Sequence, residues 1–169
     1  MLHKGFTLIE LIVTISVVAI LLTIAIPNFQ TFVLNNRLTG QANDMMTALN
    51  YARSEAIKRG LPVSMCSSTT GNTCAGSTDW STGWIVFADP DNDGVFNAGD
   101  TLLRAGPALG GNNTLNAGLA AVTFDSGGFA RASATTYRLC DSRPATFARN
   151  IQLAGSGRAK VATGAASCP

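Results

Sequence analysis

The sequence predicts an α+β fold in which a long N-terminal helix packs against an antiparallel β-sheet. Three observations predict this fold. An apolar run of 21 residues comes first, an amphipathic helical pattern follows it, and short strand-like segments separated by turn signals make up the rest. Because 169 residues is the length of about one domain, the helix and the strands are expected to share one core.

The apolar run extends from Phe6 to Ile26, and Glu10 is its only charged residue. At 1.5 Å per residue it covers about 30 Å, the thickness of the hydrocarbon core of a bilayer. Lys4 precedes it, so the short N-terminal tail is expected in the cytoplasm and the remainder outside. No small-x-small cleavage site follows the run, which argues against an ordinary secretory signal. Residues 6–27 are therefore predicted to be a membrane-spanning helix.

The helical pattern resumes after Pro27, where we expect a kink because proline removes a backbone donor. Residues 28–60 are predicted to form an amphipathic helix that ends at Gly60, with Pro62 close behind. Its apolar stripe is Ala42, Met45, Met46, Leu49, Ala52 and Ala56. Such a stripe is typical of a face covered by a sheet, and we interpret it as core.

Residues 61–169 are predicted to form a β-rich head. The expected strands are Pro62 to Cys66, Gly83 to Ala88, Thr101 to Arg104, Ala121 to Phe124, Thr136 to Cys140, Ala148 to Leu153 and Arg158 to Ala162. They are too short and too evenly spaced for βαβ units, so an antiparallel sheet is expected. The glycine- and asparagine-rich stretch from Ala105 to Ala120 is predicted to be a long exposed loop.

The composition narrows the possible functions. Charged residues make up only 13% of the chain and the net charge is +2, which excludes a disordered charged tail. The single histidine, His3, lies before the apolar run, which leaves no histidine for catalysis or metal binding in the head. An enzyme is not expected, because no nucleophile, base and orienting group can be assembled.

Four cysteines, Cys66, Cys74, Cys140 and Cys168, lie on the side expected to be exported. An even number of cysteines in an oxidising compartment predicts disulfides, and three pairings are possible. We favour Cys66 with Cys74, which closes a short loop, and Cys140 with Cys168, which pins the C-terminal tail. A zinc site is disfavoured because the cysteines have no CxxC spacing.

The segment GFTLIE, from Gly5 to Glu10, resembles the processing motif of type IV pilins and type II secretion pseudopilins. The resemblance implies that a prepilin peptidase removes residues 1–5 by cutting between Gly5 and Phe6, and that the new amine of Phe6 is methylated. Glu10 would be the acidic residue of this family. A carboxylate among apolar stems needs a cation, and the amine of a neighbouring subunit's Phe6 can supply one during assembly.

Further segments resemble the GspH/FimT group of minor pilins and pseudopilins. They are Asn36 to Gly60, Gly83 to Gly94, Leu139 to Arg143 and Gly157 to Lys160, with a Cys-Pro end. The resemblance implies the type IV pilin fold and a minor filament subunit whose partners are other major and minor pilins. Such a subunit would sit in the inner membrane with a periplasmic head before it joins a pilus at the cell surface.

Some FimT-type members of this group resemble DNA receptors for natural transformation that carry a GRxR motif. Here the motif is Gly157, Arg158, Ala159 and Lys160, so its second basic residue keeps the charge but loses the bidentate fork of arginine. If these residues are extended, Arg158 and Lys160 face one side about 6.8 Å apart. The resemblance therefore implies double-stranded DNA as a partner, held by sequence-independent phosphate contacts.

The distribution of charge supports this hypothesis. Residues 61–130 carry a net charge of −5, whereas residues 131–169 carry +5. A basic C-terminal third suits phosphate contact, and Arg143, Arg138 and Arg131 are expected to assist. Arg149 is a poorer candidate because it alternates with apolar residues. Two alternatives stay open: a purely structural subunit that primes pilus assembly, and a minor pseudopilin of a type II secretion system.

An acidic segment raises a separate hypothesis about calcium. Asp89, Asp91, Asp93 and Asp100 fall at positions 1, 3, 5 and 12 of an EF-hand-like loop, with Gly94 at position 6. The flanking segments are predicted strands and not helices, so an Asp- and Gly-rich hairpin turn is the main interpretation. Calcium is the only cofactor that the sequence suggests, and it is kept as the alternative.

Overall fold

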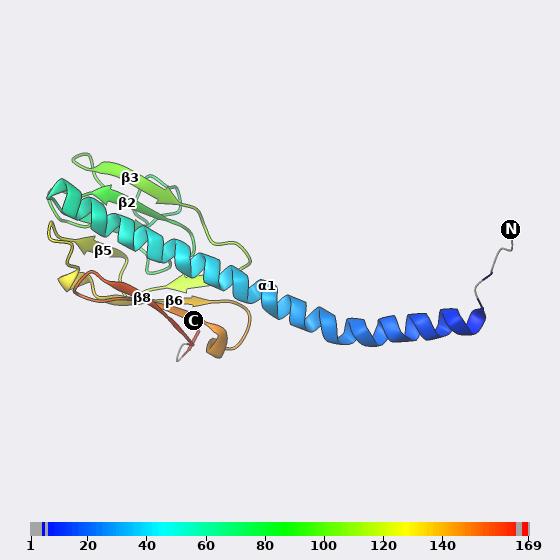
Figure 1. Ribbon diagram of the computed structural model, residues 1–169. Coiled ribbons are helices and arrows are strands. Elements are labelled where there is room, and N and C mark those ends of the chain that lie inside the picture. The colour runs from blue at the N-terminus through cyan, green and yellow to red at the C-terminus, as the bar shows by residue number, and fades with distance from the viewer. Residues whose placement is uncertain (1–4, 6, 165–166, 169) are drawn as a thin grey trace. The chain divides into compact units, whose positions relative to one another are not determined.

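The computed structural model describes residues 5, 7–164 and 167–168 (Figure 1). One α-helix, α1, runs from Leu8 to Arg59 and continues through Pro27. The chain divides into two compact units, one up to Arg37 and the other, the head, from Leu38 onward. The helix ends where the sequence predicts, since Gly60 follows it with a φ of +67°.

The first unit contains the apolar half of α1, whose residues from Leu8 to Phe32 are all exposed. Its few polar side chains bond within the helix: the hydroxyls of Thr14, Ser16 and Thr23 donate to backbone carbonyls three or four residues earlier. The helix is long and apolar enough to cross a membrane by length and composition. We call this apolar segment, residues 8–32, the stem.

The head contains two four-stranded antiparallel sheets in place of the single sheet expected from the sequence. Sheet A has the order β3-β2-β1-β5, and sheet B has the order β4-β6-β7-β8. Sheet A consists of β1 (Val63–Ser67), β2 (Trp84–Ala88), β3 (Thr101–Gly106) and β5 (Ala121–Phe124). Sheet B consists of β4 (Thr114–Asn116), β6 (Thr135–Cys140), β7 (Arg149–Leu153) and β8 (Ala159–Thr163). Two short 3-10 helices, η1 (Arg131–Ser133) and η2 (Ala145–Phe147), flank β6.

Strand β4 corrects the prediction of an exposed loop from Ala105 to Ala120. It pairs with β6, and its central residue, Leu115, is only 2% exposed. The strand has only three residues and is surrounded by glycine and asparagine, so the turn signals hide it. Leu115 belongs to the core, and its carbonyl accepts the backbone N–H of Trp80 at 2.7 Å, so the strand is bonded on both sides.

The core of the head lies between the C-terminal half of α1 and the two sheets. This half of the helix runs across the strands in Figure 1. The helix contributes a stripe of small and apolar side chains, as the 3.6-residue periodicity predicts: Leu38, Ala42, Met45, Ala48, Leu49, Ala52 and Ala56 are buried. Glu55 is the buried charged residue of this helix face. Arg59 donates to it at 2.7 Å and Lys58 Nζ lies 3.5 Å away. The hydrogen bond from Arg59 chiefly holds the pKa of Glu55 below its usual value.

Both disulfides have the pairing that the sequence favoured. Cys66 at the end of β1 bonds Cys74 in the following loop, and Cys140 at the end of β6 bonds Cys168. The second bridge ties the C-terminal tail to sheet B across 28 positions of sequence. All four cysteines are bonded in disulfides, so the zinc alternative is wrong.

Candidate functional site

The outer face of sheet B is the surface on which the predicted basic residues come together. Strand alternation buries Tyr137, Leu139 and Ile151, and so turns their neighbours outward. The register then places Thr136, Gln152 and Lys160 side by side across β6, β7 and β8. We use the name "outer face of sheet B" for Thr136, Arg138, Asn150, Gln152 and Lys160, together with Arg158, which directly precedes β8 at the edge of this face.

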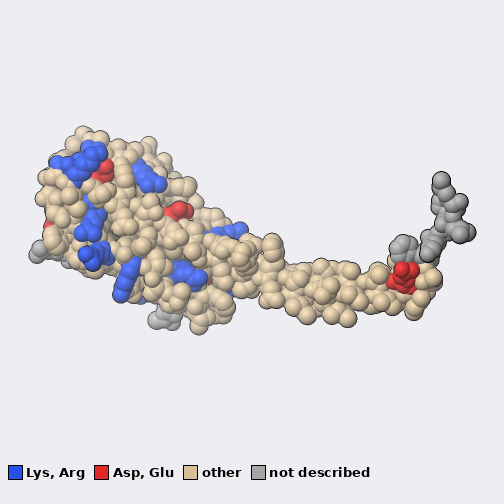
Figure 2. Space-filling view, viewed as in Figure 1, with Lys and Arg blue, Asp and Glu red and all other residues tan. Residues whose placement is uncertain are grey.

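Three cations on this face are available for a ligand. Arg138, Arg158 and Lys160 are exposed, and none forms an ion pair or a side-chain hydrogen bond with any residue that the structure describes. Figure 2 shows Lys and Arg side chains gathered on one face of the head, over the end of α1 and beside β8, with fewer acidic side chains among them. Such a surface favours anions over cations as ligands.

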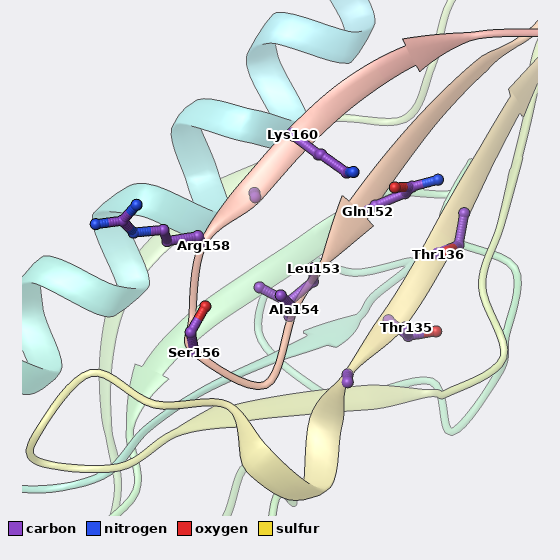
Figure 3. Close-up of a pocket in the computed structure, with 10 residues that line it drawn as sticks. Thr135, Thr136, Gln152, Leu153, Ala154, Ser156, Arg158 and Lys160 are labelled. Carbon is purple, nitrogen blue, oxygen red and sulfur yellow. The ribbon is translucent and has the colours of Figure 1, made fainter.

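An open hollow of about 680 Å³ has both cations of the GRAK motif in its lining, together with Thr135, Thr136, Gln152 and Ser156. Lys160 points toward Gln152 across the hollow, whereas Arg158 points in the opposite direction (Figure 3). Both side chains are exposed at the same end of β8, but they diverge. The expectation that they face one side is therefore wrong, because β8 begins only at Ala159 and Arg158 belongs to the turn. Together they suit an extended anion with several charges better than one small anion.

Gly157 sets the position of Arg158. It closes the turn between β7 and β8 by donating its backbone N–H to the Ala154 carbonyl at 2.8 Å, with a φ of +75°. A Cβ atom at this position would lie 1.9 Å from the Gly128 carbonyl oxygen, so only glycine fits. The turn therefore requires the glycine of the motif, and it places Arg158 directly after that glycine.

Arg143 is placed differently from the other predicted contacts. Its guanidinium donates to Asp141 Oδ2 at 2.6 Å and lies 4.4 Å from the centre of the Phe147 ring, and its side chain is 14% exposed. Burial by itself would raise the pKa of Asp141, but the hydrogen bonds and charge of Arg143 outweigh it and hold that pKa below its usual value. Arg143 thus neutralises Asp141, and little of its side chain is exposed to contact a phosphate.

Two other arginines complete the predicted set. Arg149 is half-buried and donates to the carbonyls of Phe147 and Ala148, which agrees with its being the poorer candidate. The backbone of Arg131 belongs to η1, but its side chain lies outside the described part of the structure. Arg131 stays a prediction.

Sequence reasoning missed several residues around this site. The ion-pair partner Asp141 lies only two residues from Arg143, and the side-chain hydrogen bond between them could have been anticipated from that spacing. Thr136 and Gln152 were not anticipated, because their place beside Lys160 depends on the register of three strands. Only the period of two within each predicted strand hinted at a shared face.

The acidic segment forms a tight turn around Asp89. The Asp89 carboxylate is buried, accepts from Ser64 of β1, and accepts the backbone N–H groups of Asp93 and Gly94. Burial chiefly raises its pKa. One oxygen each from Asp89, Asp91 and Asp93 lies within 4.8 Å of the others, a spacing that could hold a cation.

Asp100 does not join that group of three carboxylates among the described residues. Its carboxylate instead accepts from the backbone of Asn97, whose side chain donates to Asp91 and Asp93. The loop connects the antiparallel strands β2 and β3, and hydrogen bonds from Asn97 hold its two sides together, as the hairpin interpretation expects. Calcium binding by Asp89, Asp91, Asp93 and Asp100 remains a hypothesis.

The predicted processing and assembly residues lie at the start of the stem. Gly5 is exposed, Phe6 lies outside the described residues, and the backbone N–H of Glu10 donates to the Thr7 hydroxyl at 3.3 Å. Glu10 is exposed, as are its apolar neighbours. The chain thus presents an acidic group within an uncovered apolar helix, which is a surface that requires a partner.

A long helix with an apolar N-terminal stem, packed at its other end against antiparallel sheets, defines the class of pilin-type proteins. The sequence matches the family model described as Type II transport protein GspH over residues 41–157, and the prokaryotic N-terminal methylation motif over residues 1–26. The chain belongs to the GspH family and is a minor pilin or pseudopilin, a structural subunit and not an enzyme. Its methylation motif implies processing by a prepilin peptidase.

Two crystal structures of the type IV minor pilin FimU from Pseudomonas aeruginosa strain PAO1 are similar to this chain. One superposes with a TM-score of 0.64 at 21% identity and covers 82% of this chain and 99% of that chain. The other has a TM-score of 0.61 at 21% identity, with coverage of 78% and 100%. At this identity the likeness shows the fold, which is the predicted type IV pilin fold. No curated protein sequence matches the chain.

Proposed function

We propose that this chain is a minor subunit of a type IV pilus whose stem packs among the stems of other pilins. The observation that carries this proposal is the uncovered stem: from Leu8 to Phe32 every residue is exposed, and Glu10 is the only charge. Apolar area of this extent is stable only in a bilayer or against other apolar helices. The matched methylation motif supports processing that releases such a stem for assembly.

Filament localisation tests this function. The tagged chain is expressed in its own host, surface filaments are sheared off, and the sheared fraction is probed for the tag. We expect the tag in that fraction, and we expect it to disappear when the prepilin peptidase is deleted. A chain found only with components of a type II secretion system would instead identify a pseudopilin.

A second function, non-specific DNA contact during natural transformation, is favoured by the three cations on the outer face of sheet B. Arg158, Lys160 and Arg138 are exposed and have no competing acidic partner among the described residues. The strand spacing separates Arg138 from Lys160 by about 12 Å, so different phosphates of a duplex can be contacted at once. Arg143 is left out of this set because it already pairs with Asp141.

Salt-dependent binding tests the DNA contact. The full chain in a non-ionic detergent is titrated with duplex DNA at rising salt, beside Arg158→Gln/Lys160→Gln. Each lost phosphate contact lowers the slope of log K against log salt by about 0.9, so the double variant is expected to lose nearly two units. The control Arg37→Gln/Arg104→Gln removes the same charge from exposed residues outside sheet B and the end of α1, and is expected to keep the slope. Equal losses in both variants would contradict a site on sheet B.

A further inference from the structure

Three parts of the head meet at the carbonyl group of Gly128, in the loop that follows β5. Arg53 of α1 donates to this oxygen from Nε at 3.1 Å. The turn between β7 and β8 packs against the same oxygen, since a Cβ at Gly157 would lie only 1.9 Å from it. A backbone hydrogen bond of 3.0 Å from Ala130 to Gly155 joins the same two loops. One carbonyl group therefore lies between the helix and the turn that carries Arg158.

Gly128 is held closely on its helix side as well. A Cβ at Gly128 would lie 2.7 Å from Ile57 Cδ1 and 3.2 Å from Arg53 Cγ, which are one helical turn apart. Its φ of +77° also disfavours any other residue. The Arg53 side chain is half-buried in this contact. Its methylene groups pack against Gly128, and its Nε donates to the Gly128 carbonyl.

We propose that Arg53 is a positioning residue for the DNA contact: by holding the Gly128 carbonyl against Gly157, it fixes the turn from which Arg158 projects. This inference rests on the proposed DNA contact. A cation on a fixed turn loses less conformational entropy when it binds than a cation on a mobile turn. Without the guanidinium, the Gly128 carbonyl loses its side-chain donor. The carbonyl is then held less firmly against Gly157, and the turn between β7 and β8 becomes more mobile.

Hydrogen exchange tests the positioning step without DNA. In the full chain in a non-ionic detergent, Arg53→Met is compared with Lys58→Met, which removes the same charge from an exposed side chain on the same helix. We expect the Gly157 amide, which donates to Ala154, to exchange faster in Arg53→Met only. Unchanged exchange in Arg53→Met would overturn the role of Arg53. Because no DNA is present, this result does not depend on the proposed function.

A double-mutant cycle tests the link to DNA. Arg53→Met is expected to weaken duplex binding about fivefold in the wild type and to have little effect in the Arg158→Gln background, because coupled residues are not additive. Equal losses in both backgrounds would show that Arg53 acts on DNA directly or through overall charge, and would overturn the proposal. If Arg53→Met does not fold, Arg53→Ala replaces it, because it also removes the donor to Gly128 and favours the helix, and it must show the same coupling. A wild type that binds no DNA would contradict the proposed DNA contact. The exchange measurement would still test whether Arg53 holds the turn at Gly157.

Discussion

Tyr137 of β6 lies edge-on to Trp80, with ring centres 5.1 Å apart and an interplanar angle of 82°. Both rings are fully buried beneath α1, and the Trp80 N–H donates to the Leu119 carbonyl. The Tyr137 hydroxyl, in contrast, has no hydrogen-bond partner among the described residues. Burial raises the pKa of this phenol, which stays neutral throughout the physiological range. The ring therefore contributes packing, whereas its hydroxyl carries a desolvation cost.

Tyr137→Phe is expected to leave the stability unchanged or to raise it by up to about 1 kcal/mol, because it removes an unpaired polar group and keeps the ring. Tyr137→Ala is expected to cost about 3 to 5 kcal/mol, the usual loss for a large buried aromatic ring. Denaturant unfolding of both variants measures these changes. A clear loss of stability in Tyr137→Phe would reveal a partner for the hydroxyl.

The two disulfides are expected to differ in how much they stabilise the head. In the chain-entropy model a bridge stabilises more as the closed loop lengthens, with about 2.5 kcal/mol for 8 residues and about 3.6 kcal/mol for 28. Loss of Cys140–Cys168 is therefore expected to cost about 1 kcal/mol more than loss of Cys66–Cys74. Paired Cys→Ala variants, unfolded in denaturant, give the comparison. A larger loss at Cys66–Cys74 would mean that packing of the buried Cys66 outweighs loop entropy.

The sequence predicts those parts of the fold that depend on local periodicity. The buried stripe from Ala42 to Ala56 and the end of α1 before Gly60 follow from the 3.6-residue pattern and from a helix-stop signal. Strand β4 and the division into two sheets do not, because they depend on which strands pair over long distances. Leu115 alone marks β4, and a single apolar residue is too weak a pattern to predict a strand.

The site was predictable to a similar extent. Strand alternation places Lys160 and Arg138 on an exposed face, and the sequence shows that alternation directly. The pairing of Arg143 with Asp141 was not foreseen, because charge counts treat each arginine as available. The contact between Arg53 and Gly128 spans 75 positions and arises only when the loops meet. Counts of charge thus identified the basic region, but local contacts with Asp141 and with the carbonyls of Phe147 and Ala148 occupy two of its arginines.

The ion pair between Asp141 and Arg143 is expected to make stability depend on acid pH. The pKa of Asp141 is lower in the folded state than its value of about 3.9 in an unfolded chain. Its stabilisation is therefore present above about pH 4 and is lost as the pH falls through the folded pKa. Arg143→Gln is expected to cost about 1.5 to 3 kcal/mol at pH 7 and much less near pH 2.

Denaturant unfolding across this pH range measures the difference between Arg143→Gln and the wild type. Arg138→Gln is the matched control, since Arg138 is exposed and forms no ion pair with a described residue. It is expected to show no pH-dependent difference. A constant difference for Arg143→Gln at all pH values would assign its effect to packing on Phe147 and not to the ion pair.

Gly157→Ala is expected to destabilise the head by about 2 kcal/mol or more. A left-handed conformation costs a non-glycine residue about 1 to 2 kcal/mol, and the contact with Gly128 adds overpacking. Gly110→Ala is the control, because no atom lies within 4 Å of a Cβ there and its φ is not positive. Thermal unfolding of both variants decides the matter. Equal melting temperatures would mean that the turn can move away from Gly128 at little cost.

Glu10→Ala is expected to separate processing from assembly. The cleavage position between Gly5 and Phe6 is unchanged in this variant, so the prepilin peptidase should still shorten the chain. The carboxylate that would pair with the amine of a neighbouring Phe6 is lost, and a free amine among apolar stems is costly without a counter-charge. We therefore expect normal processing on immunoblots and a reduced amount of the chain in sheared filaments.

Glu10→Gln is the control for Glu10→Ala, since it keeps the size and polarity of the side chain but not its charge. If the charge is what matters, both variants should be depleted from filaments to the same degree. Normal incorporation of Glu10→Gln with depletion of Glu10→Ala would point to a hydrogen bond in place of an ion pair. Normal incorporation of both would refute the pairing role and would leave register to the apolar stem alone, whose exposed side chains from Leu8 to Phe32 then have to supply all the specificity.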